Sequence, residues 1–258
     1  MRIFLALVLA TPLTLFAQAH SHDGHDHGAP DLGNIGKAHL ETSCGEAART
    51  EIDRGVALIH SFWYAEAEKS FRRAAAADAD CGMAWWGVAM SNLHPIWAPP
   101  TPDELKTGRE AAEKAKQIGA KTDREKAFIA AIATFYADSD KVDHKTRMLA
   151  YETAMASIER DHPKDREAAI FHALSLLGTA QPNDKTYARQ KQAAEILNRV
   201  LPEAPEHPGV AHYLIHSFDY PELAQLALPA ARVYAKLAPG SPHALHMPSH
   251  IFTRVGSW

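Results

Sequence analysis

The chain has 258 residues, of which 46% are hydrophobic and 22% charged, a composition typical of a folded protein. Its 27 Lys and Arg against 31 Asp and Glu give a net charge of −4, and no basic cluster occurs, which argues against nucleic-acid binding. Sixteen histidines accompany only two cysteines, so a cysteine-based zinc finger is excluded and histidine-based metal chemistry is not.

The first nineteen residues have the pattern of a signal peptide. Arg2 precedes an almost uninterrupted apolar run over 3–16, and Ala17-Gln18-Ala19 has the small-x-small spacing of a cleavage site. The run is too short to span a membrane, and we predict no other span. We expect cleavage at about Ala19 and a secreted or periplasmic protein; a buried N-terminal helix is the alternative.

Residues 20–43 follow as a segment rich in Gly, His and Asp, which predicts a flexible leader. Cleavage would leave a free amine on His20 and place His22 at the third position. An amine, two amides and an imidazole form a square-planar set that suits Cu(II) and Ni(II). The alternative is a disordered tail that chelates metal adventitiously.

From Cys44 to the end, at 258, the sequence is rich in alanine and interrupted by Pro, Gly or Asp, which predicts helices joined by loops. No alternating pattern long enough for a strand is present. Five consecutive helix pairs are predicted, over residues 45–60 and 63–78, 81–93 and 102–118, 123–137 and 143–160, 165–178 and 186–201, and 208–218 and 221–237.

The first pair contains a recognisable packing motif. Gly55, Ala67, Phe71 and Ala74 have the small–small–aromatic–small spacing of a tetratricopeptide repeat, in which small residues let two helices approach and the aromatic ring fills the space between them. We therefore predict an all-α fold over residues 44–258, a tetratricopeptide-type α-solenoid in which antiparallel helix pairs form a right-handed superhelix. An irregular helical bundle is the alternative.

Internal similarity supports a repeat architecture. The peptide Leu-Ile-His-Ser-Phe occurs at 58–62 and again at 214–218. Pro205 and Pro239 are separated by the tetratricopeptide period of 34 residues. First helices of such pairs line the concave groove of a superhelix, so we expect a groove that holds a peptide or protein ligand.

Cys44 and Cys81 precede two consecutive first helices and should lie at the same rim. In an oxidising compartment we expect them to be paired, with two buried thiols as the alternative.

The segment 242–258 predicts a first helix without a partner helix, in which Ile251, Phe252, Val255 and Trp258 would be uncovered. The chain would then be a fragment of a longer solenoid or would self-associate through this helix.

The histidine spacing predicts a metal site in the groove. His212 and His216 lie four residues apart and project from one helix face, and His246 and His250 repeat this spacing 34 residues later. One repeat later means the same place on the neighbouring helix, so four imidazoles should meet on the solvent side of the groove floor. Four imidazole ligands favour Cu or Zn as the bound metal and suit Ni less well.

Further residues join this prediction. His243 is a spare ligand, Arg254 is expected to hold an anionic group, and His60 and His172 are further groove candidates. If Pro248 starts a new helix, His243 and His246 would leave the face of His250. A metal-free groove that binds a peptide remains the main alternative.

The sequence lacks the His-Glu-x-x-His signature, a phosphate-binding loop and a nucleophile elbow, so we assign no catalytic residue and no nucleotide cofactor. An enzyme would be a metal-dependent oxidase or hydrolase.

Several stretches resemble exported bacterial tetratricopeptide-repeat proteins. They are Leu58-Ile-His-Ser-Phe-Trp63, Cys81-Gly-Met-Ala-Trp-Trp-Gly-Val-Ala-Met90, His212-Tyr-Leu-Ile-His216 and the segment from His243 to Arg254. The resemblance implies export and the solenoid fold, and it implies no reaction. Glu51 and Ala79 depart from the usual repeat, which has tryptophan and proline there.

Overall fold

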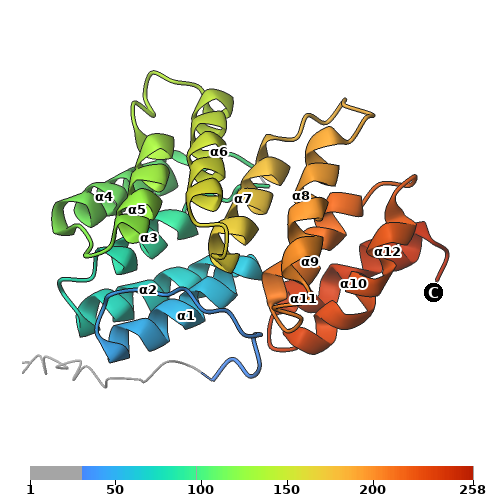
Figure 1. Ribbon diagram of the computed structural model, residues 1–258, viewed down its shortest axis with the longest axis horizontal. Helices are drawn as coiled ribbons and strands as arrows, with labels where there is room; N and C mark the ends of the chain where they lie inside the picture. Colours follow the sequence, from blue (N-terminus) through green and yellow to red (C-terminus); the bar gives the residue numbers. More distant parts are fainter. Residues whose placement is uncertain (1–30, 97, 258) are drawn as a thin grey trace, which may run out of the picture. The chain divides into compact units, whose positions relative to one another are not determined.

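The computed structural model describes residues 31–96 and 98–257, and the predicted signal peptide, His20 and His22 lie outside them. Every regular element in these ranges is a helix (Figure 1). The helices are α1 (Glu46–His60), α2 (Tyr64–Ala77), α3 (Gly82–Ser91), α4 (Pro102–Ile118), α5 (Asp123–Tyr136), α6 (His144–Asp161), α7 (Arg166–Thr179), α8 (Ala188–Val200), α9 (Pro208–Phe218), α10 (Ala224–Leu237), α11 (Pro242–His246) and α12 (Pro248–Arg254). The all-α prediction and the five predicted pairs are confirmed for the described residues.

Side-chain caps explain why these helices begin where they do. Thr101 and Thr122 each form a reciprocal capping box with a glutamate three residues later. Asp143 accepts a hydrogen bond from the Thr146 amide at the start of α6, and Asp165 caps α7 in the same way. Each cap satisfies amide groups that the first helical turn leaves without an internal partner.

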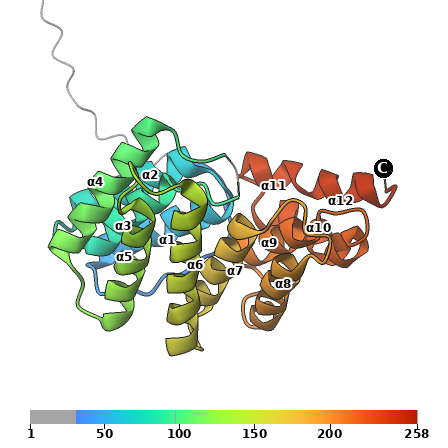
Figure 2. The same cartoon turned by 90° about the horizontal axis from the view of Figure 1, so that it is seen from above.

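Consecutive helices pack against each other as hairpins, an arrangement consistent with an α-solenoid. Contacts α1–α3, α3–α5 and α7–α9 link neighbouring pairs. In addition α1 contacts α9, which brings the first and fifth pairs together. The short helices α11 and α12 follow one another in line beside α10 (Figure 2).

The first helices of the pairs form much of the core. In α3, α7 and α9, nine of ten, twelve of fourteen and ten of eleven residues are buried. Trp86 packs edge to face against Phe71, Phe128 and Phe171. The prediction that α9 presents its histidines on the solvent side of a groove is therefore wrong for His212, which is fully buried, whereas His216 is half-buried.

The small–small–aromatic motif of the first pair packs as predicted. A Cβ added to Gly55 would lie 2.7 Å from the Phe71 ring, and one added to Gly87 would lie 2.0 Å from it. Phe71 is fully buried, and so are Ala67 and Ala74. Phe71 thus fills the space that glycines of α1 and α3 leave.

Residues 31–43 are packed against the helices. The Gly240 amide donates a hydrogen bond of 2.8 Å to the Asn34 carbonyl. Leu40 is buried, and its amide donates to Asp53. The prediction of a flexible leader is therefore wrong for 31–43.

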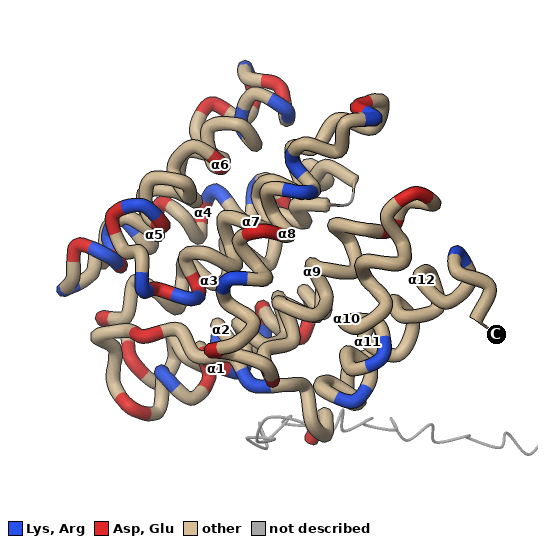
Figure 3. The backbone as a smooth tube through the Cα atoms, turned by 45° about the vertical axis from the view of Figure 1, so that its right-hand side comes forward, with Lys and Arg blue, Asp and Glu red and all other residues tan. Residues whose placement is uncertain are grey.

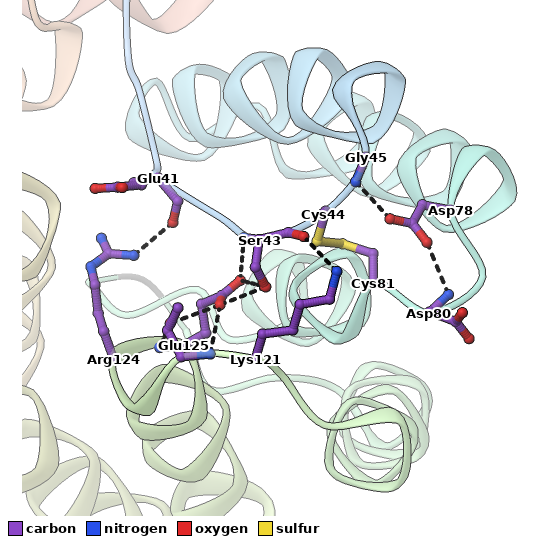
Figure 4. Close-up of a disulfide and its surroundings, with 11 residues drawn as sticks. Glu41, Ser43, Cys44, Gly45, Asp78, Asp80, Cys81, Lys121, Arg124 and Glu125 are labelled. Atoms are coloured by element: carbon purple, nitrogen blue, oxygen red, sulfur yellow. Dashed lines mark hydrogen bonds between the residues drawn. A yellow bond between two sulfur atoms is a disulfide. The ribbon is translucent and has the colours of Figure 1, made fainter.

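Cys44 and Cys81 form the predicted disulfide, with Cα atoms 5.2 Å apart (Figure 4). Around it, Asp78 accepts a hydrogen bond from the Gly45 amide and Glu125 accepts from the Ser43 amide and hydroxyl. The bridge joins the start of α1 to the start of α3, as expected for two neighbouring pairs. A disulfide of this kind indicates an oxidising compartment.

The C-terminal helices are covered. Helix α12 packs against α10, Ile251 is fully buried, and Phe252 and Val255 are half-buried. The prediction of a helix without a partner is therefore wrong, and self-association through its bare apolar side chains loses its physical basis. Trp258 lies outside the described residues.

Charged residues are distributed unevenly among the helices (Figure 3). Helices α3 and α9 contain no Asp, Glu, Lys or Arg, whereas α4, α5 and α6 carry both signs. Among the described residues, no helix combines the length and the apolarity that crossing a bilayer requires.

Candidate metal centre

Three histidines meet where α9 lies beside α11. His212 and His216 come from α9 and His243 comes from α11. One nitrogen of each ring can serve as a ligand, and these three nitrogens lie within 4.8 Å of one another. The partners predicted one repeat later, His246 and His250, are not part of this group, and His243, the expected spare, is its third member.

His212 is held in one orientation by the backbone of α1. Its Nδ1–H donates a hydrogen bond of 2.6 Å to the carbonyl oxygen of His60. Its Nε2 therefore carries the lone pair, and it lies 3.0 Å from the Nε2 of His216. Ligand nitrogens about 3.3 Å apart are what a tetrahedral zinc ion with Zn–N bonds of about 2.05 Å requires. A metal ligand whose second nitrogen donates to a carbonyl is also the usual arrangement in metal sites.

Aromatic rings enclose the three imidazoles. Phe62 lies with its ring centroid 4.3 Å from that of His212 and 5.4 Å from those of His216 and His243. On another side Tyr234 stacks on His212 at 4.9 Å. Phe62 has a φ of 53°, a strained conformation for a side chain of this size. The fold thus holds a strained residue where its ring covers the cluster.

Burial keeps the three imidazoles neutral. Desolvation, followed by the neighbouring histidines, lowers the pKa of His212 well below its ordinary value. The same causes lower the pKa of His216 to about 3 and that of His243 to about 4. At neutral pH all three therefore offer lone pairs without first losing a proton.

His246 and His250 form a separate pair beside this group. Their Nε2 atoms are 3.0 Å apart, and the Nδ1 of His250 is 3.0 Å from an Asp219 carboxylate oxygen. Although Pro248 begins α12, the imidazoles of His246 and His250 lie on the same face of the helical segment formed by α11 and α12. The expected four-imidazole cluster is thus divided into three histidines and two.

The remaining predicted ligand-binding residues are engaged elsewhere. Arg254 forms an ion pair with Asp219, so the structure assigns its guanidinium to a carboxylate of the chain itself. His172 is buried and hydrogen-bonded to Glu159. His60 is fully buried, and its ring bonds to Glu167. The prediction that His60 and His172 line an open groove is wrong.

Glu167 lies between two histidines in a second buried group. The Nε2 atoms of His60 and His207 are 2.9 and 2.8 Å from its two oxygens. The Nδ1 of His207 accepts from the Gly209 amide, and that of His60 accepts from the Tyr213 hydroxyl. Both Nε2 atoms therefore donate to the carboxylate, and this group is a complete hydrogen-bond network. A third group includes Cys44 and Cys81, whose disulfide leaves no thiolate.

Sequence reasoning missed Phe62, Glu167 and His207. One signal was available for Phe62, because the peptide 58–62 is repeated at 214–218. In the structure these two copies contact each other through Phe62 against His216, and the His60 carbonyl of the first copy binds His212, two residues before the second copy. No local pattern indicates Glu167 or His207, which meet only through contacts between distant helices.

A pocket of about 490 Å³ lies away from the histidine cluster and contains none of the predicted site residues. Arg124, Asp161 and Lys164 are among the residues that line it.

No family model and no curated protein matches the chain.

Proposed function

We propose that the protein binds one transition metal ion, zinc or copper, through His212, His216 and His243. The observation that carries the proposal is the convergence of three ligand nitrogens within 4.8 Å, one of them oriented by the His60 carbonyl. Three imidazoles leave a fourth position for water or for a ligand atom from another molecule.

We further infer that the scaffold is an α-solenoid of the tetratricopeptide type in an exported protein. The packing of Phe71 against Gly55 and Gly87 supports the repeat type, and the apolar run over 3–16 together with the Cys44–Cys81 bridge supports export. Mass spectrometry of the protein isolated from the periplasm should find a chain that begins at His20. A chain that retains residues 1–19 would contradict export by this route.

Isothermal titration with Zn²⁺ and Cu²⁺ tests the metal site in the full chain. Because the N-terminal histidines can chelate metal themselves, the whole series carries glutamine at positions 20, 22, 25 and 27. The parent should bind one ion tightly, and His243→Gln should weaken that affinity at least 100-fold because one of three ligands is lost.

Two further variants complete the comparison. His216→Gln should act like His243→Gln, which guards against a folding defect in either one. His39→Ala removes an exposed histidine that pairs with Asp53, and it should leave the affinity unchanged. Equal affinity in the parent and in both ligand variants would overturn the proposal.

A further inference from the structure

The two histidine pairs are built in the same way. In each pair, residues i and i+4 of the helical segment bring their Nε2 atoms to 3.0 Å from each other. In each pair the Nδ1 of one imidazole bonds to an oxygen, which is the His60 carbonyl for His212 and Asp219 for His250. Because their Nδ1 atoms donate, the Nε2 atoms of His212 and His250 carry lone pairs, and each faces the Nε2 of its partner histidine across a hydrogen bond that a metal ion would replace.

The pairs differ in exposure and in ligand number. His212 is fully buried and shares its site with His216 and His243, whereas His246 is exposed and the His250 side chain is 38% exposed. Two imidazoles and solvent bind an ion less firmly than three imidazoles in an enclosed site. An ion on His246 and His250 would therefore exchange readily.

The pairs are also adjacent. The ring centroid of His243 is 6.2 Å from that of His246 and 6.1 Å from that of His216. His243 thus lies between His246 of the exposed pair and His216 of the buried site. An ion can pass between them by exchanging one imidazole at a time.

Asp219 positions the exposed pair. One of its oxygens accepts from the Nδ1 of His250, and the other is paired with Arg254. The carboxylate fixes the His250 tautomer and increases the basicity of its Nε2. Arg254 in turn orients the carboxylate.

We propose that His246 and His250 form a second, exchange-labile metal site that loads the buried site of His212, His216 and His243. This inference rests on the proposed function. It assigns the exposed pair to capture of the ion, His243 to transfer and the buried site to retention.

The test measures the rate of loading by stopped-flow absorbance, with Co²⁺ as the spectroscopic probe. All proteins are full-length and carry the four N-terminal glutamine substitutions. His246→Ala/His250→Ala should still bind one Co²⁺ at equilibrium, but its association rate should fall at least tenfold. Asp219→Asn should slow loading in the same direction and to a smaller extent.

His39→Ala is the matched control. It removes an exposed imidazole whose Nδ1 lies 2.8 Å from an aspartate oxygen, and its loading rate should equal that of the parent. Because His246 is exposed and His250 partly so, the double variant should keep its helical circular dichroism and its apo melting temperature.

The outcomes separate the two proposals. Unchanged association in the double variant overturns the loading site and leaves the proposed function intact. Loss of the single bound ion in the double variant also overturns it, because His246 and His250 would then belong to one shared site. A parent that binds no Co²⁺, Zn²⁺ or Cu²⁺ overturns the proposed function itself.

Discussion

Glu167 shows how one buried carboxylate joins distant parts of the chain. It accepts hydrogen bonds from His60 at the end of α1 and from His207, which caps α9. Burial acts to raise the pKa of Glu167, but His207 and His60 outweigh it and hold the pKa well below its ordinary value. The carboxylate is therefore charged, and two helices depend on its contacts.

We expect Glu167→Gln to lower the free energy of unfolding by about 3 kcal/mol at pH 7, because the amide has one acceptor oxygen for two N–H donors. A carboxyl with a lowered folded pKa stabilises the protein above its unfolded pKa of about 4.3, and this contribution is lost as the pH falls below that value. The difference between wild type and variant should therefore shrink between pH 7 and pH 3.

Urea denaturation at several pH values measures this difference. Glu206→Gln, which removes an exposed ion pair with Lys37, is the control and should change stability by less than about 0.5 kcal/mol. A difference between wild type and Glu167→Gln that stays constant down to pH 3 would contradict this account.

At the scale of elements, the helices could be predicted because their ends are encoded locally. Thr101 and Thr122 with their glutamates, and Asp143 and Asp165, mark helix starts within a few residues. Residues 31–43 could not be predicted in the same way. Their anchors, such as Leu40, are isolated apolar residues without periodicity, and they are fixed by contacts with distant helices.

The contact between α2 and α3 allows a sharp test, since Gly87 of α3 lies directly against Phe71 of α2. An alanine in a helix ordinarily stabilises it by about 1 kcal/mol relative to glycine. At Gly87 the added Cβ would lie 2.0 Å from the Phe71 ring. We therefore expect Gly87→Ala to destabilise the protein by about 1–3 kcal/mol through overpacking.

A double-mutant cycle with Phe71→Leu isolates the cause of this effect. The smaller side chain leaves room for the methyl group, so Gly87→Ala should cost less in the Phe71→Leu background than in wild type. Denaturant midpoints of the four proteins measure the coupling. An equal cost in both backgrounds would show that overlap with Phe71 is not the reason.

At the scale of the whole molecule, the contact of α1 with α9 determines the character of the site. Helical spacing predicted that His212 and His216 would meet His246 and His250, whereas the histidine that meets them is His243. It could not reveal that α1 closes over them, because this contact joins residues about 150 positions apart in sequence. Closure buries His212 and brings Phe62 over the cluster, so an expected open groove becomes an enclosed site.

The disulfide belongs to the same closed arrangement but acts at its other end. It links residues 37 positions apart, and the chain-entropy relation gives a stabilisation of about 3–4 kcal/mol for a loop of that size. Cys44→Ser/Cys81→Ser should lower the free energy of unfolding by that amount. Metal affinity should be unchanged below the melting transition, because the bridge lies at the start of α1, about 22 Å of helix away from His60 at its end.

Denaturation and metal titration of the same double variant separate these two effects. Cys44→Ser alone is unsuitable as a control because it leaves a free thiol, which can bind metal itself. Wild type treated with reductant serves as the comparison for the denaturation only, because its two free thiols can bind metal as well. Reduced stability with intact affinity is expected, whereas a matching loss of both would show that the α1–α9 contact, and with it the His60 carbonyl that orients His212, depends on the bridge.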